Sequence, residues 1–535
     1  MALTRIPYRN TGYFSTLICD LVDRHPTLAG FQTNAVDLAA FETQIATKAN
    51  QFPVANRAGL VSVLKEQYRQ LPDTAPVLEN VDLLALPNTF TVTTGHQLNL
   101  FTGPLYFIYK IISTIKLCHQ LKEKYPKHNF VPVYWMATED HDFEEISFFH
   151  FKGKKIKWTQ ESNGAVGRLS LEALAPLLTL FEQSLGENKN ATQIKEWIEL
   201  SYRSSKNLGE ATLRLVHQLF AAYGLVILDA DEHALKANFI PHIKNELTVG
   251  NCHDAVNQSI ETFKANYNSA YNPQVNPREI NLFYLTDQGR ERIVKTLTGF
   301  ALANSNTSFT KGDLMKEVEE FPERFSPNVL MRPLYQEVIL PNLCYIGGGG
   351  EIAYWLQLKN YFERENITFP LLLLRNSALL ISEKNSKKLS RLGLDFESVF
   401  LKRTPLINKK IREISNIDLD LQSLKDKLTD QFDYLESLVK ATDPSFEGTV
   451  KAQKQKQFKG IDRLEKRLLN AQKKKLVDQV ERLSTLHEAL FPQESLQERH
   501  ANFFEFYLEY GAELMPQLFD QIDPLQHEFS CIELP

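Results

Sequence analysis

The sequence is poor in cysteine and contains no long apolar run. Its five cysteines are widely separated along 535 residues, without a C-x-x-C pair. Such a sparse, odd-numbered set indicates reduced thiols and argues against a disulfide framework or a zinc ribbon. No apolar stretch approaches the ~20 residues that a membrane helix needs, and the N-terminus lacks the apolar core of a signal peptide. We therefore expect a cytoplasmic protein that neither spans a membrane nor is exported.

The sequence also lacks a strong excess of either charge. It has 60 Lys and Arg residues against 65 Asp and Glu residues, a formal net charge of −5. This balance argues against a dedicated nucleic-acid or membrane-surface protein. Locally, residues 451–475 contain ten Lys or Arg and only two Asp or Glu. Because Phe458 is the sole aromatic there that could stack on a base, we interpret the segment as a solvated helix face and expect no nucleic-acid partner.

The sequence does contain the alternation of strands and helices that is typical of an α/β protein. Residues 89–94 are β-branched or aromatic, residues 105–121 form a long apolar helical pattern, and residues 130–137 are nearly all apolar. Strand, helix and strand within about 50 residues predict a βαβ unit. Further apolar strands are expected within residues 224–231, 329–333, 343–346 and 369–375. The alternation predicts a Rossmann-like core with a mostly parallel sheet.

Changes of pattern divide the chain into six segments. We expect a helical N-terminal segment, two halves of the core, each with an insertion, a helical hairpin and a C-terminal segment that packs on the core. The predicted ranges are 1–88 (N-terminal helices), 89–146 (first half of the core), 147–222 (inserted connecting-peptide region), 223–415 (second half with a further insertion), 416–491 (coiled-coil hairpin) and 492–535 (C-terminal segment).

Two apolar stripes predict the hairpin. One runs over residues 421–439 and the other over residues 461–490, with a Pro- and Gly-containing breaker at residues 443–448 between them. This pattern predicts an antiparallel α-helical coiled coil. Two helices alone leave apolar surface that either the core domain or a second copy of the chain must cover. We expect a homodimer joined through the coiled coil, as the simpler solution.

The turn after the first strand is the first candidate site. Thr93-x-Gly95-His96 fits the T/H-x-G-H pattern of class I nucleotidyltransferases and lies where open α/β sheets bind ligands, beyond a strand's carboxyl end. In that pattern the glycine lets a phosphate approach the backbone, and the histidine steadies developing charge. The alternative is a structural turn, in which His96 caps the following helix and Gly95 supplies a positive φ.

A second candidate site follows the second strand. Residues 138–145 contain five acids and one histidine, a crowding that favours a cationic ligand. We consider His141 as a general acid or base that Asp140 or Asp142 orients, and an amino group or a metal as the ligand. The alternative is a solvated acidic turn in which Asp142 caps the next helix.

Two later segments complete the set. Gly347 to Gly350 form a four-glycine turn between a strand and a helix, where backbone N–H groups can close on an anion. The turn fits neither G-x-G-x-x-G nor a P-loop, Glu351 favours an amine there, and a purely structural turn remains the alternative. Arg332, which we place at a strand end, either binds a carboxylate or pairs with one of the acids.

Together these motifs resemble the bacillithiol biosynthesis cysteine-adding enzyme family over the whole chain. The resemblance rests on residues 94–97, 102–106, 109–110, 132–135, 139–142 and 347–351. It implies a core related to class I nucleotidyltransferases and cysteinyl-tRNA synthetase, with connecting-peptide insertions and a dimerising coiled coil. It also implies a ligase that joins the carboxyl group of L-cysteine to the amino group of glucosaminyl malate, the last step of bacillithiol synthesis.

The expected site combines the motifs with the family pattern. A nucleotide, ATP or ADP, would activate the cysteine carboxylate, and we assign no metal. The expected catalytic residues are His96, Asp140, His141 and Asp142. The expected substrate-binding residues are Gly95, Gln97, Asn99, Tyr106, Lys110, Arg332, Gln336, Gly347, Glu351 and Tyr354. Of these, Arg332 or Lys110 would bind the malyl carboxylates.

Two other functions fit the same motifs. One is a nucleotidyltransferase-like enzyme that acts on another amine or carboxylate acceptor. The other is a non-catalytic nucleotide-binding protein whose coiled coil carries the function. Substitution of His96 or of the strand-end acids separates them, since these residues matter to both enzymes and not to the non-catalytic protein.

Overall fold

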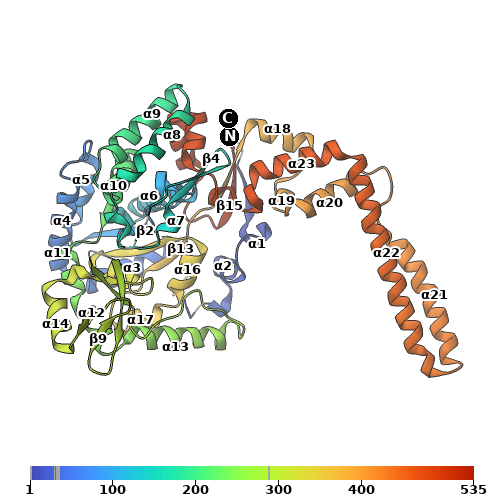
Figure 1. Cartoon of the computed structure of the whole chain (residues 1–535), viewed down its shortest axis with the longest axis horizontal. Helices are drawn as coiled ribbons and strands as arrows, with labels where there is room; N and C mark the ends of the chain where they lie inside the picture. Colours follow the sequence, from blue (N-terminus) through green and yellow to red (C-terminus); the bar gives the residue numbers. More distant parts are fainter. Residues whose placement is uncertain (1–2, 29, 32–35, 161, 163, 287–288) are drawn as a thin grey trace.

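A five-stranded parallel sheet forms the centre of the protein (Figure 1). The computed structural model describes residues 3–28, 30–31, 36–160, 162, 164–286 and 289–535. The strand order is β13-β12-β2-β3-β6, and every neighbouring pair is parallel. The strands are β2 (Thr89–His96), β3 (Asn129–Met136), β6 (Val226–Asp229), β12 (Asn342–Gly347) and β13 (Leu371–Leu374). The predicted Rossmann-like α/β core is therefore confirmed.

Burial on both faces explains the apolar character of these strands. β2, β3 and β12 are almost completely buried, as expected for central strands of a parallel sheet covered by helices. Helix α6 (Tyr106–Lys124) connects β2 to β3 and contributes a largely buried face to the same core. Because the strands are parallel, the chain leaves β2, β3, β6 and β12 at one edge of the sheet.

Two insertions flank that edge. The first contains the hairpin β4 (Phe148–Phe151) and β5 (Lys154–Lys157), with helices α8 (Ala175–Leu185), α9 (Lys189–Ile198) and α10 (Leu208–Phe220). The second contains an antiparallel sheet in the order β10-β9-β8-β7-β11. Its strands are β7 (Leu282–Thr286), β8 (Gly289–Lys295), β9 (Phe300–Leu302), β10 (Ser308–Phe309) and β11 (Phe325–Pro327).

The N-terminal segment is not wholly helical, which corrects the prediction for residues 1–88. β1 (Leu3–Pro7) pairs antiparallel with β15 (Glu528–Leu534), which pairs parallel with β14 (Ala378–Ser382). The two termini accordingly lie side by side in Figure 1. The remaining helices of this segment are α1 (Tyr8–Thr11), α2 (Thr16–Val22), α3 (Ala40–Gln51), α4 (Val54–Tyr68) and α5 (Ala75–Leu83). The partner of β1 is distant in sequence, so no local pattern marks that strand.

The strand expected at residues 329–333 is also wrong. β11 ends at Pro327, and Arg332 is the first residue of helix α15 (Arg332–Ile339). Pro333 in the first helical turn fits this position, because its ring fixes a helical φ where its missing N–H costs nothing. The prediction followed the apolar residues before Arg332 and overlooked that proline.

The C-terminal region contains the predicted coiled coil. Helices α21 (Gln422–Lys440) and α22 (Glu447–Lys475) pack on each other and project from the body as an arm (Figure 1). Phe432, Val439 and Val450 are buried between them. The second apolar stripe is interrupted at Leu476, where α22 gives way to α23 (Val477–Leu490). α23 contacts α20 (Arg403–Ile414) and so belongs to the base of the arm.

The other helices cover the core. They are α7 (Phe143–Ile146), α11 (His233–Lys236), α12 (Ile240–Thr248), α13 (Asn251–Asn266), α14 (Lys311–Glu320), α16 (Gly349–Leu356), α17 (Lys359–Arg364), α18 (Glu383–Arg391), α19 (Phe396–Val399), α24 (Phe503–Tyr510) and α25 (Leu514–Gln521). Within the described residues, no helix is both long enough and apolar enough to cross a membrane. All five cysteines lie in the described part of the chain as buried free thiols.

Candidate active site

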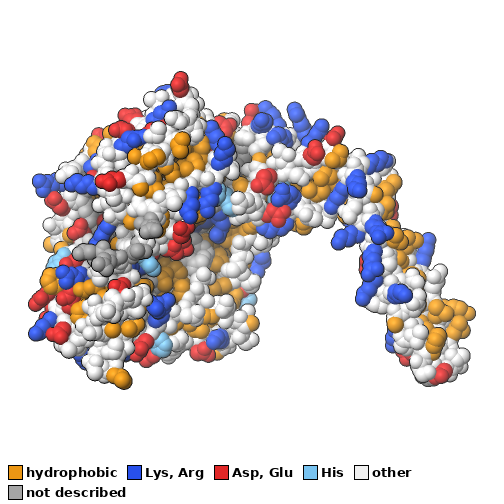
Figure 2. All heavy atoms as spheres, viewed as in Figure 1, with side chains coloured by type: hydrophobic (Ala, Val, Ile, Leu, Met, Phe, Trp, Pro, Cys, Tyr) orange, Lys and Arg blue, Asp and Glu red, His pale blue; other side chains and the backbone are white. Residues whose placement is uncertain are grey.

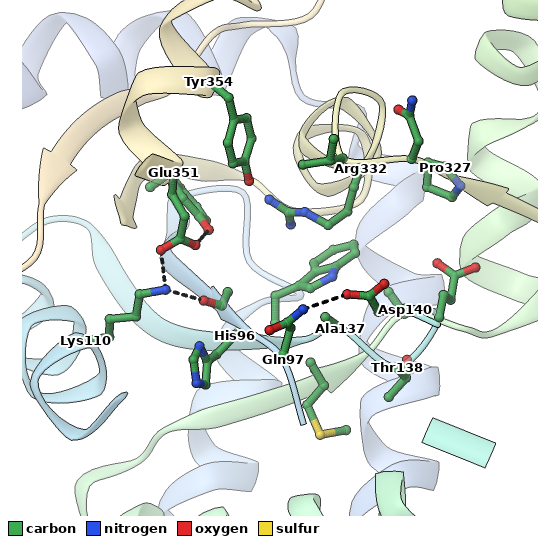
Figure 3. Close-up of a pocket in the computed structure, with 18 of the residues that line it drawn as sticks. His96, Gln97, Lys110, Ala137, Thr138, Asp140, Pro327, Arg332, Glu351 and Tyr354 are labelled. Atoms are coloured by element: carbon green, nitrogen blue, oxygen red, sulfur yellow. Dashed lines mark hydrogen bonds and ion pairs between the residues drawn. The ribbon is translucent and has the colours of Figure 1, made fainter. Parts of the chain in front are cut away.

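A cavity of about 360 Å³ opens at the carboxyl edge of the parallel sheet (Figure 3). The structure brings together there the predicted residues Gly95, His96, Gln97, Tyr106, Lys110, Asp140, Arg332, Glu351 and Tyr354. They come from β2 and the loop after it, α6, the loop after β3, α15 and α16. Segments far apart in the sequence therefore meet in one cavity.

Five predicted residues lie outside the cavity lining. His141 and Asp142 are exposed on the loop after β3, and Asn99 donates its side-chain amide to the Glu145 carbonyl, 3.2 Å away. Gln336 is completely buried behind Arg332. Gly347 lies outside the lining, where an added Cβ would be 3.0 Å from the Tyr345 ring and 3.1 Å from Glu351, so a side chain would fit only if these neighbours moved.

His96 is a neutral histidine at the end of β2. Its ring meets the Tyr106 ring edge-to-face at 5.5 Å between centroids. Burial, followed by the charge of Lys110, lowers the pKa of His96 to about 3. Its buried Nε2 has no hydrogen-bond partner in the part of the chain that the structure describes. Because α6 begins only at Tyr106, His96 is not the cap of that helix.

Gly95 is required by a close approach. A Cβ at this position would lie 3.1 Å from the Tyr345 hydroxyl and 3.9 Å from Arg332 Nη1. The first of these distances is tighter than ordinary van der Waals contact. The glycine therefore keeps the backbone of β2 open toward the cavity, and its φ is not positive. This observation replaces the alternative of a left-handed turn.

Glu351 occupies the helix start after the glycine turn. It accepts hydrogen bonds from the Tyr345 hydroxyl at 2.7 Å and the Gly348 amide at 2.8 Å, and Lys110 Nζ pairs with it at 2.5 Å (Figure 3). Burial raises the pKa of Glu351, but these partners lower it below its usual value. Lys110 also donates to the Gly95 carbonyl at 2.8 Å. The amine that Glu351 binds is thus the side chain of Lys110.

Asp140 is held as a carboxylate. It accepts hydrogen bonds from Gln97 Nε2 at 3.0 Å and from the His141 backbone amide at 2.8 Å, and Arg290 Nη1 lies 3.8 Å away. Burial raises the pKa of Asp140, but the hydrogen bonds and Arg290 together hold it well below its usual value. Asp140 is consequently a poor proton acceptor and a good anchor for an ammonium group.

Glu139 precedes Asp140 in the sequence, and its pKa is raised instead of lowered. It pairs with Lys236, yet burial raises its pKa. Its side chain lines the cavity and is 12% exposed. The strand end therefore presents two carboxyl groups with different affinities for a proton, of which Glu139 is the stronger acceptor.

Arg290 is a cavity residue that the sequence did not reveal. It reaches the cavity from β8 of the inserted sheet, and all three guanidinium nitrogens are engaged. Nε donates to Ser326 Oγ at 3.1 Å, Nη2 to the Pro327 carbonyl at 2.8 Å, and Nη1 contacts His141 Nδ1 at 3.1 Å. No motif surrounds Arg290 in the sequence, and only the folded insertion brings it to the site.

Arg332 differs from the other two cations of the cavity. Its guanidinium lies 5.6 Å from the Trp135 ring, and Nη1 donates to Gln336 Oε1 at 3.1 Å. Burial lowers the pKa of Arg332, but the nearby Tyr354 and Tyr345 raise it above its usual value, and Tyr354 also does so through a side-chain hydrogen bond. Its buried Nη2 finds no hydrogen-bond partner among the described residues. Arg332 therefore has a donor available for an anionic ligand.

The loop between His96 and α6 is held by the C-terminal segment. Phe101, Thr102 and Gly103 have φ values of 51°, 65° and 62°, which are strained for the first two residues. The Asn502 amide donates to the carbonyls of Phe101 at 2.8 Å and Gly103 at 2.7 Å. Residues at the far end of the chain thus fix the loop that carries Gln97.

The charges of the cavity suit a ligand with both an amino group and a carboxylate. Asp140 offers negative charge and Arg332 positive charge in the same cavity, and neutral His96 lies beside Lys110 (Figure 3). Within the described residues, no group of three or more His, Cys, Asp or Glu side chains could hold a metal ion. Fold and cavity define a Rossmann-like α/β protein with a polar ligand site and a C-terminal coiled coil.

Comparison with protein families identifies the group to which this architecture belongs. Residues 1–376 match the family model "Bacillithiol biosynthesis BshC, N-terminal Rossmann-like domain". Residues 378–534 match "Bacillithiol biosynthesis BshC, C-terminal coiled-coil domain". The chain belongs to the bacillithiol biosynthesis BshC family, which confirms the resemblance seen in its motifs.

Curated relatives agree over the full length. A protein from Flavobacterium johnsoniae is 53% identical over 529 residues, with 99% of both chains covered. One from Christiangramia forsetii is 50% identical, with 98% of both chains covered, and one from Cytophaga hutchinsonii is 37% identical, with 98% and 97% covered. Each carries the name "Putative cysteine ligase BshC", the name of an enzyme.

Proposed function

We propose that this protein is a ligase that joins the carboxyl group of L-cysteine to the amino group of glucosaminyl malate in bacillithiol synthesis. The observation that carries the proposal is that one cavity contains both an ionised carboxylate and a guanidinium donor. The carboxylate is Asp140, and the donor is Arg332 Nη2, which lacks a hydrogen-bond partner among the described residues. The acceptor has an amino group and two carboxylates, which match these two side chains. Membership of the family supports the same reaction.

The residues take distinct roles in amide formation. Asp140 holds the ammonium form of the acceptor, and Arg332 binds its malyl carboxylates. The amine must lose a proton before it attacks the activated carboxyl carbon. Glu139 is the better acceptor for that proton, because burial raises its pKa while the pKa of Asp140 is lowered. Lys110, the other candidate for the carboxylates, is engaged by Glu351 and Gly95.

A nucleotide is the proposed source of activation for the cysteine carboxyl. When bound, ATP supplies the leaving group that a carboxylate lacks. The glycine turn fits a phosphate poorly, because the Glu351 carboxylate already accepts the Gly348 amide. His96 fits better, since its buried Nε2 has no partner within the described chain and Gly95 beside it admits a close approach. A cavity of about 360 Å³ suits small ligands.

A product assay tests the proposed function. Purified protein is incubated with L-cysteine, glucosaminyl malate and ATP, and each component is omitted in turn. We expect bacillithiol by mass spectrometry only in the complete mixture. Product without ATP would remove the nucleotide from the reaction, and its absence with each of several nucleoside triphosphates would contradict the ligase.

Asp140→Asn is expected to weaken binding of glucosaminyl malate by about tenfold or more, because a charge-assisted contact to the ammonium group is lost. Binding of ATP should be unchanged. Titration calorimetry measures both affinities. Asp142→Asn is the matched control, since Asp142 is exposed outside the cavity lining. Equal weakening by the two variants would contradict the assignment.

Dimerisation through the arm is proposed from its exposed apolar side chains. Leu435 and Leu464 are 43% and 58% exposed on α21 and α22, and Figure 2 shows hydrophobic side chains gathered toward the outer end of the arm. A second copy of the arm would cover them in a twofold dimer. Such a surface seldom remains open to solvent in a stable monomer.

Leu435→Glu combined with Leu464→Glu should convert a dimer into a monomer with a folded body. Light scattering should give twice the chain mass of 61.4 kDa for the wild type. Leu297→Glu, at a fully exposed leucine of the second insertion, is the control that should remain dimeric. A wild type of single-chain mass at micromolar concentration would refute the proposal.

A further inference from the structure

A series of hydrogen-bonded, buried polar side chains leads from Arg332 away from the cavity. Arg332 Nη1 donates to Gln336 Oε1 at 3.1 Å, and Gln336 Nε2 donates to Glu337 Oε1 at 3.0 Å. Glu337 Oε2 then pairs with Lys48 Nζ of α3 at 2.9 Å. Gln336 is 0% exposed, and Glu337 and Lys48 are each 2% exposed. The order of groups in this series is the Arg332 cation, the Gln336 amide, the Glu337 carboxylate and the Lys48 cation.

Further hydrogen bonds hold Glu337 in place within this series of side chains. Glu337 Oε1 also accepts the Asn342 amide at 2.6 Å, and Asn342 Oδ1 accepts hydroxyls from Thr91 and Thr93 of β2. The carboxylate therefore has partners on both oxygens, which a buried charge requires. Only one orientation of the Gln336 amide places its oxygen toward the guanidinium and its nitrogen toward the carboxylate.

We propose that Gln336, held by Glu337 and Lys48, is a positioning residue that fixes the Arg332 guanidinium so that Nη2 faces the carboxylate of the acceptor. The role rests on the proposed function and assigns Gln336 a place behind the site instead of the substrate contact expected from the sequence. The fixed geometry lowers the cost of ordering a flexible side chain when the ligand binds.

The amide is suited to this task in a way that a carboxylate is not. A glutamate at position 336 would pair directly with Arg332 and cancel the charge that attracts the ligand. The amide oxygen holds Nη1 and leaves the positive charge of the guanidinium available. The negative charge of Glu337 stays one side chain further back, where Lys48 balances it. The aromatic rings of Trp135 and Tyr345, 5.6 and 5.7 Å from the guanidinium, support the same orientation.

Gln336→Met is the first test, because it keeps the length of the side chain and removes both hydrogen bonds. We expect KM for glucosaminyl malate to rise by about tenfold while KM for L-cysteine stays unchanged. Gln357→Met is the matched control, since Gln357 is also 0% exposed and hydrogen-bonded, to residues 274 and 275. The control should lower the melting temperature without changing either KM.

A double-mutant cycle shows whether Gln336 acts through Arg332. In an Arg332→Met background, adding Gln336→Met should cause no further loss of affinity for glucosaminyl malate. Independent, additive losses would overturn the proposal, and so would an unchanged KM in a folded Gln336→Met variant. Neither result would change the outcome of the product assay with the wild type. Failure of the positioning role of Gln336 can therefore be distinguished from failure of the proposed ligase function.

A second variant tests the same proposal by moving the charge. Gln336→Glu combined with Glu337→Gln keeps the net charge but places the carboxylate against Arg332 and leaves Lys48 facing an amide, so a thermal melt first checks that the variant is folded. We expect this folded variant to bind glucosaminyl malate about tenfold more weakly in titration calorimetry, because its guanidinium is already paired. Affinity equal to that of the wild type would overturn the proposal.

Discussion

His96→Ala is expected to lower turnover by about 10²-fold or more, as removal of one donor to a developing negative charge does. The buried Nε2 of His96 has no hydrogen-bond partner within the residues described by the structure. Such an atom costs stability unless a ligand satisfies it, so its place in the cavity indicates a role toward substrate. Steady-state assays of cysteine addition, beside a thermal melt, measure the effect.

Two variants separate chemistry from stability in this test. His96→Gln restores a neutral amide donor near the position of Nε2 and should recover part of the turnover. His217→Ala removes another buried histidine, whose Nε2 contacts the Pro72 carbonyl far from the cavity, and should affect the melt alone. Full turnover in a well-folded His96→Ala protein would exclude His96 from the mechanism.

The pKa of about 3 also predicts the pH dependence. His96 is neutral above about pH 4, so it acts as a neutral hydrogen-bonding group and not as a cation. The profile of kcat between pH 5 and 8 should therefore have the same shape in the wild type and in His96→Gln. A protonation step near pH 6 that disappears in the variant would mean that His96 changes charge during turnover.

The sequence predicts the parallel core because its signals are local. β2, α6 and β3 are adjacent in the chain, and burial on both faces gives the strands nearly continuous apolar patterns. β1 could not be found in this way. It pairs with β15 at the opposite end of the chain, and nothing in residues 3–7 distinguishes a strand from a short helix.

The same distinction applies to the candidate site. His96 ends β2, Asp140 lies in the loop after β3, and Glu351 lies in the first turn of the helix after β12, so strand prediction locates them. Arg290 reaches the cavity from an inserted antiparallel sheet, a placement that depends on tertiary structure alone. The contact between Arg332 and Gln336 could have been predicted from the sequence, because Pro333 indicates the start of a helix and residues four apart share a helical face.

Arg332→Met is expected to lower kcat/KM for glucosaminyl malate by about 10²- to 10³-fold, mainly through KM, while KM for L-cysteine changes little. Lys110 and Arg290 line the same cavity, but Lys110 Nζ is held by Glu351 and the Gly95 carbonyl, and each nitrogen of Arg290 already has a partner. Neither can therefore replace the lost guanidinium. Steady-state kinetics with each substrate varied in turn measure the effect.

Arg57→Met is the matched control, since Arg57 is a buried arginine that donates to the carbonyls of Leu84 and Pro87 away from the cavity. It should lower stability and leave both KM values unchanged. Arg332→Lys should recover only part of the loss, because an ammonium group keeps the charge without the planar pair of donors. If Arg332→Met instead raises KM for L-cysteine alone, the guanidinium binds the cysteine carboxylate. Asp140 and Arg332 would then hold the amino acid instead of the acceptor.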